Sequence, residues 1–291
     1  MSCIIGLIQI SVSPHKSWNI QHAMENIREA AESGAQIICL PELFSTPYFP
    51  QHIGLDSSPF TDTCDGATIY RFSKLALELG CVLIVPICEK SSDNRIYNSA
   101  VVIDADGSVF RPYRKIHIPQ DPLFYEKGYF NPGDEYRIYK TKYANLAVLI
   151  CFDQWFPEAA RLMALAGAEL LIYPTAIGWE TTDSEEEKQR QLEAWITIQR
   201  SHAIANGLPI VSCNRVGHED DPSGETGGIQ FWGNSFVAGP QGEILVQASN
   251  QQEENLLVDV DLARSEQVRR IWPFFRDRRI DSYQDLTKRW R

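Results

Sequence analysis

The pattern of apolar and polar positions predicts an α/β protein. Short, nearly continuous runs of Ile, Leu and Val are typical of strands buried on both faces, and longer runs with helical periodicity separate them. A glycine follows each expected helix, where a left-handed terminal residue is favoured. The expected strands are residues 4–10, 36–40, 81–87, 146–150, 169–173 and 208–213, and the expected helices are residues 18–33, 68–79, 157–166 and 187–206. This alternation of strands and helices indicates an α/β fold.

Two hairpin-like stretches interrupt the alternation. Residues 99–114 contain two strand-like runs joined by Asp104-Ala-Asp-Gly107, and residues 230–246 repeat this pattern around Gly239-Pro-Gln-Gly242. We therefore predict an αββα sandwich, in which two mixed β-sheets pack face to face and helices flank them. No low-complexity linker divides the chain. We expect one domain over residues 1–260 and a tail over residues 261–291 that packs on this domain or on a neighbouring subunit.

Composition and charge narrow the class of protein. The chain has 291 residues, of which 44% are hydrophobic and 22% charged, and a formal net charge of -11. Such a charge argues against nucleic acid or an anionic membrane as a partner and is compatible with a cationic substrate. The N-terminus lacks the basic start of a secretory signal, and no apolar run approaches the ~20 residues of a membrane span.

The cysteine pattern indicates a reducing compartment. Seven cysteines are an odd number, they form no CxxC pair, and most lie in or beside apolar runs. Free buried thiols of this kind are typical of cytoplasmic proteins. No pair of His or Cys residues has the spacing of a zinc site. We therefore expect a soluble cytoplasmic protein without a metal or another cofactor.

Cys151 lies at the junction between an expected strand and an expected helix. Residues 146–150 have strand character, and Pro157 and Glu158 open an Ala- and Leu-rich helical stretch. Proline fits the first turn of a helix, and an acid there is favoured by the helix dipole. Unpaired backbone N–H groups at such a junction lower a thiol pKa and stabilise an oxyanion. Cys151 is therefore a candidate nucleophile for attack on a carbonyl or nitrile carbon.

Two further polar residues follow strand-like runs. Glu42 ends Ile37-Ile-Cys-Leu-Pro-Glu, and Lys115 follows the first hairpin in Tyr113-Arg-Lys-Ile-His. Each residue alone is more often a solvated charge. Together with Cys151 they form a complete chemical set, because a carboxylate accepts the thiol proton, an ammonium stabilises an oxyanion and the thiol attacks. Active groups of open α/β sheets gather at the carboxyl ends of strands.

The chain resembles the nitrilase, or carbon–nitrogen hydrolase, superfamily. The resemblance rests on three blocks that occur in this order: Leu40-Pro-Glu-Leu-Phe, Tyr113-Arg-Lys-Ile-His and Cys151-Phe-Asp-Gln-Trp-Phe-Pro-Glu. It implies that Glu42 is the general base, that Lys115 stabilises the oxyanion and that Cys151 is the nucleophile. It also implies that Glu126, in Phe124-Tyr-Glu-Lys, is an additional active-site acid. The αββα fold of this family agrees with the fold predicted from periodicity.

Three other stretches resemble the N-carbamoylputrescine amidase branch of the family. They are residues 124–133, 173–180 and 272–279. The resemblance implies a small cationic ureido substrate, a role in the biosynthesis of putrescine and other polyamines, and a homo-oligomer built from dimers. Glu180 is the candidate for binding the substrate ammonium, with a simple loop acid as the alternative. Trp155, Tyr129 and Trp179 are candidates for the walls around the methylene chain through apolar and cation–π contacts, unless they only pack.

Several other functions remain as alternatives. A β-ureidopropionase-like enzyme, an ω-amidase or an aliphatic amidase would use the same catalytic residues on another substrate, and a substrate that ends in a carboxylate would require a cation in the pocket. A catalytically silent binding module is a further possibility, which the complete set of Glu42, Lys115 and Cys151 argues against. No GxGxxG or GxxxxGK[ST] loop follows an expected strand, so a nucleotide-binding protein is disfavoured. His117 is expected to be a structural group rather than a base.

Overall fold

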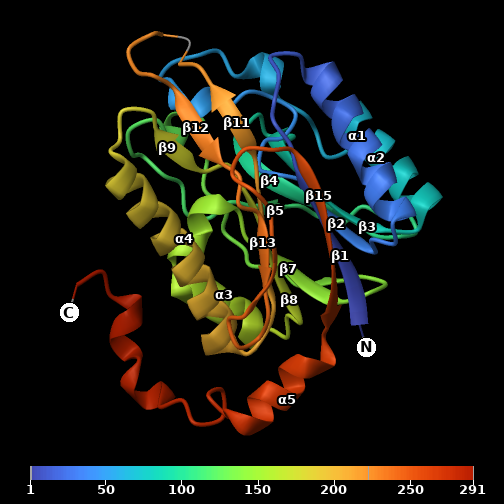
Figure 1. Ribbon diagram of the computed structural model, residues 1–291, viewed down its shortest axis with the longest axis vertical. Coiled ribbons are helices and arrows are strands. Elements are labelled where there is room, and N and C mark those ends of the chain that lie inside the picture. The colour runs from blue at the N-terminus through green and yellow to red at the C-terminus, as the bar shows by residue number, and fades with distance from the viewer. Residues whose placement is uncertain (1, 222, 291) are drawn as a thin grey trace.

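Two six-stranded β-sheets stack face to face between two pairs of helices in the computed structural model, which describes residues 2–221 and 223–290 (Figure 1). In the first sheet β1, β2 and β3 are parallel, and the flanking strands pair antiparallel. The order of its strands is β15 (Glu254–Asp261), β1 (Ser2–Gln9), β2 (Ile37–Cys39), β3 (Val82–Lys90), β4 (Ile96–Ile103) and β5 (Tyr113–Arg114).

The second sheet repeats this plan. Its central strands β10, β8 and β7 are parallel, and antiparallel strands continue it on both sides. The strand order is β14 (Ile244–Gln247), β13 (Phe236–Ala238), β10 (Ile210–Asn214), β8 (Leu170–Thr175), β7 (Asn145–Val148) and β6 (Tyr139–Lys140). The predicted pair of mixed sheets is therefore confirmed.

Helices cover the outer face of each sheet. Helices α1 (Lys16–Glu32) and α2 (Ala67–Leu79) lie on the first sheet, and α3 (Pro157–Leu165) and α4 (Glu185–Asn206) lie on the second (Figure 1). The glycine after each predicted helix has a positive φ, as at Gly80 (66°) and Gly207 (56°). The predicted αββα sandwich is confirmed.

The alternation of side chains along the strands divides the core into layers. In β2, Ile37 and Cys39 face the second sheet, whereas Ile38 packs with the neighbouring Leu40 against α1 and α2. Successive side chains of a strand point to opposite faces, so a strand between two layers must be apolar at every position. This requirement explains why the strands in the centre of each sheet are continuous apolar runs.

A third, three-stranded sheet was not predicted. It consists of β11 (Val216–Glu219), β12 (Ile229–Trp232) and β9 (Gly178–Glu180), all antiparallel. The second predicted hairpin is therefore only partly right, because β12 leaves it for this sheet and β13 and β14 form the hairpin around residues 239–242. Short 3₁₀-helices complete the fold: η1 (Phe49–Gln51), η2 (Ser58–Phe60), η3 (Glu126–Gly128), η4 (Cys151–Trp155), η5 (Ile280–Ser282) and η6 (Gln284–Thr287).

The C-terminal segment runs along one end of the sandwich (Figure 1). It begins with α5 (Ala263–Ile271) and continues through η5 and η6. Phe275 contacts the domain through the Arg161 guanidinium, which lies 4.8 Å from its ring, and Arg269 of α5 donates to the carbonyl of Asn206. Many of its apolar side chains are exposed, Trp290 among them at 84%. In the described part of the chain, no helix is long and apolar enough to cross a membrane.

Candidate active site

The structure brings four of the predicted site residues together between the two large sheets. Glu42 lies three residues beyond β2, Lys115 follows β5 directly, Glu126 opens η3 and Cys151 opens η4 after β7. Glu42, Lys115 and Glu126 are 0% exposed, and Cys151 is 6% exposed. Carboxyl ends of strands from both sheets therefore meet here, as the sequence predicts.

The Lys115 ammonium links the two acids. Its Nζ lies 2.7 Å from Glu42 Oε1 and 2.8 Å from both Oε1 and Oε2 of Glu126. Lys115 bonds to both oxygens of Glu126, so one N–H of the ammonium can turn toward a ligand while another remains hydrogen-bonded to Glu126. A buried ion pair requires such additional hydrogen bonds to offset the cost of desolvation. This arrangement holds a cation next to the thiol.

Two residues that the sequence analysis missed complete this network. Asn98 in β4 donates from Nδ2 to Glu42 Oε1 (2.7 Å) and to Glu126 Oε2 (3.2 Å). The Tyr48 hydroxyl donates to Glu126 Oε1 at 2.6 Å. No local motif marks either residue, because their importance depends only on which strands and turns the fold brings together. Glu42 Oε2, in contrast, has no hydrogen-bond donor among the described protein groups.

Burial and neighbouring charges shift the pKa values of Glu42, Cys151 and Lys115. Burial raises the pKa of Glu42, and the Glu126 charge adds to this effect while Lys115 opposes it. Burial raises the pKa of Cys151 well above its ordinary value, and the Glu42 charge raises it further. For Lys115, burial lowers the pKa, but Glu126 and Glu42 outweigh it and raise the pKa overall, so the amine stays charged.

This result corrects the expectation of a lowered thiol pKa. Cys151 is not at the N-terminus of α3, because η4 separates it from Pro157. The thiol is also buried beside a carboxylate, which disfavours a resting thiolate. The backbone of Cys151 has a φ of 40°, in the left-handed region that is unfavourable for a residue other than glycine. Cys151 is therefore held as a protonated thiol in a strained turn.

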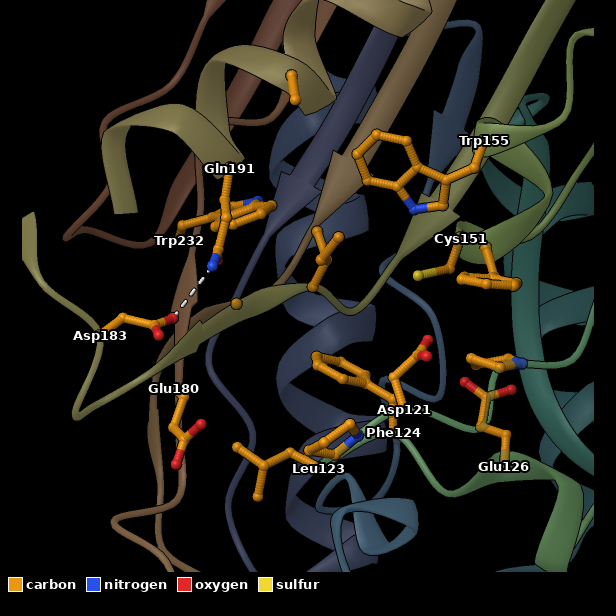
Figure 2. A pocket seen from close by; sticks show the side chains of 16 residues that line it. Asp121, Leu123, Phe124, Glu126, Cys151, Trp155, Glu180, Asp183, Gln191 and Trp232 are labelled. Atoms are coloured by element: carbon orange, nitrogen blue, oxygen red, sulfur yellow. Dashed lines mark hydrogen bonds between the residues drawn. The ribbon is translucent and has the colours of Figure 1, made fainter. Parts of the chain in front are cut away.

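A cavity of about 410 Å³ opens above this cluster. Cys151, Trp155 and Glu126 lie at one end and Glu180 and Asp183 at the other, with Leu123 and Phe124 between them (Figure 2). The side chains that line the cavity include Asp121, Glu126, Glu180 and Asp183, but no Lys, Arg or His. The predictions that Trp155 and Glu180 line the substrate pocket are consistent with these positions.

The acids at the far end of the cavity are only half-buried. Asp183 accepts a hydrogen bond from Gln191 Nε2 at 3.2 Å, and its backbone N–H donates to the carbonyl of Glu180. Within residues 2–221 and 223–290, the Glu180 carboxylate forms no hydrogen bond or ion pair. This end of the cavity, which we call the acidic end (Glu180 and Asp183), therefore presents negative charge to a ligand.

The structure does not place Trp179 or Tyr129 in the cavity lining, which corrects both predictions. Gly178 and Glu180 face the cavity from β9, so the intervening Trp179 points to the other side of the strand and packs against Trp232 at 5.4 Å. The Tyr129 hydroxyl donates to the carbonyl of His52, and its ring packs edge-on against Phe49. Both residues are packing groups.

A buried arginine fixes the turn that carries Glu42. Arg215 Nη2 donates to the carbonyls of Glu42 (2.8 Å) and Leu43 (2.9 Å), and Nη1 pairs with Glu219 at 2.5 Å. Leu43 has a φ of 49°, so the turn is strained. Glu219 also accepts from the backbone N–H of Tyr48 at 2.6 Å. The sequence analysis missed this residue, which lies far from any motif.

Comparison with known proteins agrees with this geometry. The family model for carbon–nitrogen hydrolase matches residues 4–270. The chain belongs to the carbon–nitrogen hydrolase family. This membership confirms the resemblance that the three sequence blocks indicate. It also classes the protein with enzymes that hydrolyse carbon–nitrogen bonds other than peptide bonds.

Relatives of this carbon–nitrogen hydrolase include enzymes of known substrate. N-carbamoylputrescine amidase of Oryza sativa subsp. japonica is 44% identical over 97% of this chain and 93% of its own length. Citrullinase of Francisella tularensis subsp. tularensis is 37% identical over 98% of both chains. The crystal structure of a carbon–nitrogen hydrolase from Helicobacter pylori G27 superimposes with a TM-score of 0.97 at 46% identity and covers 100% of both chains.

A more distant structure has a modified cysteine. A mutant of the amidase from Nesterenkonia sp. AN1 shows covalent addition of the acetamide moiety of fluoroacetamide at its active site cysteine. That amidase is 25% identical to this chain, with a TM-score of 0.76, and the match covers 97% of this chain and 96% of the amidase.

Proposed function

We propose that the protein is a thiol amidohydrolase that cleaves N-carbamoylputrescine to putrescine, carbon dioxide and ammonia, a step that supplies polyamine biosynthesis. The observation that carries this proposal is a cavity lined at one end by Cys151 and Glu126, behind which Lys115 and Glu42 are buried, and at the other end by acids without a cationic partner among the described residues. The relatives named N-carbamoylputrescine amidase support the same substrate.

Formation of the acyl-enzyme uses the groups at the floor of the cavity. Glu42 accepts the proton of Cys151, and the sulfur attacks the ureido carbon. Lys115 and a backbone N–H beyond Cys151 stabilise the tetrahedral oxyanion, and loss of one such donor typically costs ~10²–10³ in rate. The C–N bond to the terminal nitrogen breaks, and Glu42 returns the proton so that ammonia leaves. The product is a carbamoyl thioester that still carries the diamine.

Hydrolysis of the thioester reverses the proton movements. Glu42 accepts a proton from water, the resulting hydroxide attacks the thioester carbon, and the C–S bond breaks as the proton returns to sulfur. The released carbamic acid then decomposes to carbon dioxide and putrescine. Glu126 keeps Lys115 in place during both steps, because it retains one of the two Lys115 hydrogen bonds.

The acidic end selects for the charge of the substrate. Glu180 is proposed to pair with the distal ammonium, since a cation removed from water requires a compensating acid. Citrulline carries the same ureido group together with an α-carboxylate. The cavity lining offers three acids besides Glu126 and no cationic side chain, which disfavours such a substrate and one of the β-ureidopropionase type.

The first test concerns the nucleophile. Cys151→Ala is expected to lower the rate of ammonia release from N-carbamoylputrescine by at least about 10³-fold, because no other thiol lines the cavity. Cys64→Ala, which changes a half-buried thiol outside the cavity lining, serves as the matched control and is expected to retain activity. Retained turnover in Cys151→Ala would refute the mechanism.

The second test concerns the substrate. Glu180→Gln is expected to lower kcat/KM for N-carbamoylputrescine by about tenfold through KM, and to change kcat/KM for the neutral analogue N-butylurea much less. The exposed acid Glu193 provides the control variant Glu193→Gln. Equal effects of Glu180→Gln on both substrates would remove Glu180 from the binding site. A panel of ureido amines, ureido acids and simple amides then separates this function from a β-ureidopropionase-like, ω-amidase or aliphatic amidase activity.

We further propose a cytoplasmic homo-oligomer built from dimers. The seven unpaired cysteines support a reducing compartment. The exposed apolar side chains of the C-terminal segment, which include Trp272, Phe274 and Leu286, support contact with a second subunit. Light scattering of the intact chain and of a chain that ends at residue 271 tests this contact.

A further inference from the structure

A single buried carboxylate joins the two segments that carry Lys115 and Cys151. Asp153, the third residue of η4, is 0% exposed. Its Oδ2 accepts hydrogen bonds from the Ile150 backbone N–H (2.9 Å) and the Tyr113 hydroxyl (2.7 Å). Its Oδ1 accepts from the His117 backbone N–H (3.0 Å) and lies 2.7 Å from His117 Nδ1.

The residues that contact Asp153 lie close in sequence to Lys115 and Cys151. Tyr113 and His117 lie two residues before and two residues after Lys115, and Ile150 directly precedes Cys151. The first sheet supplies the Lys115 segment, and the second sheet supplies the Cys151 turn. Three of the four contacts of Asp153 therefore bridge the two segments, at the point where the proposed oxyanion group meets the proposed nucleophile, and the fourth, with Ile150, holds Asp153 within the Cys151 turn.

A ring contact reinforces the same bridge. The imidazole of His117 stacks on the ring of Phe156, which follows η4, with 3.7 Å between centroids and 7° between planes. With Nδ1 directed at Asp153, the imidazole is fixed on two sides by residues of the Cys151 turn. This geometry explains why His117 lines no part of the cavity and does not approach Cys151 as a base.

We propose that Asp153 is a positioning residue that sets the distance between the Lys115 ammonium and the Cys151 sulfur by holding Tyr113 and His117 against the Cys151 turn. This inference rests on the proposed function, in which Lys115 and Cys151 act on the same substrate carbon. Hydrogen bonds to a carboxylate are roughly twice as strong as those between neutral groups, so the three that cross to Tyr113 and His117 form a stiff connection. A misplacement of about 1 Å in a reacting geometry can cost 10²-fold in rate.

The chemistry of the four contacts requires a carboxylate. Three of its contacts come from fixed donors, His117 Nδ1 donates in the tautomer that carries its proton there, and a carboxylate is an acceptor at both oxygens. Burial raises the pKa of Tyr113, and the Asp153 charge raises it further, so the phenol remains a donor throughout the working pH range. Asparagine at this position would direct an NH₂ group at two of the donors. The Ile150 N–H has no freedom to rotate, so the turn before Cys151 would shift.

The decisive experiment is the isosteric variant Asp153→Asn. The fraction of competent sites is counted by mass spectrometry of the Cys151 peptide after iodoacetamide treatment, and kcat is expressed per labelled site. Asp153→Asn is expected to lower this kcat on the order of 10²-fold while KM changes by less than about threefold, because the acidic end is untouched. A kcat per site within about twofold of the parent would show that Asp153 has only a structural role and would overturn the proposal.

Milder variants decide the matter if Asp153→Asn does not fold. Tyr113→Phe removes one donor to Asp153, and Tyr139→Phe removes a similarly buried hydroxyl that donates to the backbone carbonyl of Arg111. Both are expected to lower Tm, but only Tyr113→Phe is expected to lower kcat per site. Equal kcat values for these two variants would overturn the proposal.

The histidine gives a rescue experiment. His117→Asn keeps an N–H donor near Asp153 and is expected to retain most of kcat, whereas His117→Leu is expected to lose it. Identical losses in both would contradict a positioning role through this hydrogen bond. Cys151→Ala is measured in parallel: if it retains turnover, the proposed function itself fails, whereas loss of turnover in Cys151→Ala with full activity in Asp153→Asn refutes only the positioning role.

Discussion

The two ends of the cavity are built in opposite ways. At the floor, Glu42, Lys115 and Glu126 are fully buried and exchange short hydrogen bonds with one another. At the acidic end, Glu180 and Asp183 are half-buried, and the Glu180 carboxylate forms no hydrogen bond or ion pair with another described residue. The floor is a closed network in which one ammonium is shared by two carboxylates, and the acidic end is open and has no cation in its described lining.

This difference is expected if the buried end carries out the reaction and the open end recognises the substrate. Groups that move protons and stabilise charge must be fixed before the substrate arrives, because fixed dipoles cost no reorganisation during the reaction. Groups that recognise a charged substrate must instead be left without a partner, because a partner would compete with the ligand. Breaking the floor should therefore affect stability and turnover together, and altering the acidic end should affect only binding.

The largest effect is expected from Lys115→Met. The substitution leaves two carboxylates buried without a cation, and loss of one partner from a buried ion pair costs about 3–5 kcal/mol. Unfolding by urea measures the free energy, and ammonia release measures activity. Lys127→Met, at an exposed position of η3, is the control and should change both little. A free energy of unfolding within about 1 kcal/mol of the parent would contradict the closed network.

A second effect concerns the pH dependence of kcat/KM. In the proposed mechanism Glu42 must be unprotonated to accept the thiol proton, and burial raises the pKa of Glu42. Activity should therefore fall as the pH decreases through this raised pKa, at a pH above the value of about 4.3 of an ordinary glutamate. Glu180→Gln should raise KM without moving this acid limb. An acid limb at or below about 4.3 would show that burial does not control the base.

The smallest effect is that of salt on binding. The acidic end is half-exposed, and the Debye length falls from about 10 Å at 0.1 M to 3 Å at 1 M salt. The KM of N-carbamoylputrescine should rise by about two- to threefold over this range, and the KM of N-butylurea should stay constant. An equal rise for both substrates would show that salt acts on the fold rather than on the charge at the acidic end.

The sequence predicted those parts of the fold that local patterns control. Continuous apolar runs located β1, β3, β7, β8 and β10, and terminal glycines located the ends of α2 and α4, because burial and left-handed backbone leave a direct mark on residue type. The strands β9 and β11 of the third sheet have three and four residues. Strands this short show no recognisable alternation of apolar and polar residues, and their pairing depends on the rest of the fold.

The same limit applies to the candidate site. Glu42, Lys115, Cys151 and Glu126 lie in recognisable blocks, whereas Asn98, Tyr48 and Arg215 have no local signal. Trp179 has the right residue type, but the alternation of β9 turns it away from the cavity. The predicted direction of the Cys151 pKa shift was wrong, because the burial of the thiol and its proximity to Glu42 depend on the packing of the two sheets.

Because Lys115 follows a strand of one sheet and Cys151 follows a strand of the other, neither sheet alone holds the complete set of proposed reacting groups. The turnover rate should therefore depend on how the two sheets pack against each other. Enlarging a side chain in the middle of the sandwich, such as Val148 or Ile84, would separate the partners without touching a ligand. On heating, activity should therefore be lost at a lower temperature than secondary structure, because a small displacement of one sheet against the other is enough to separate the two groups.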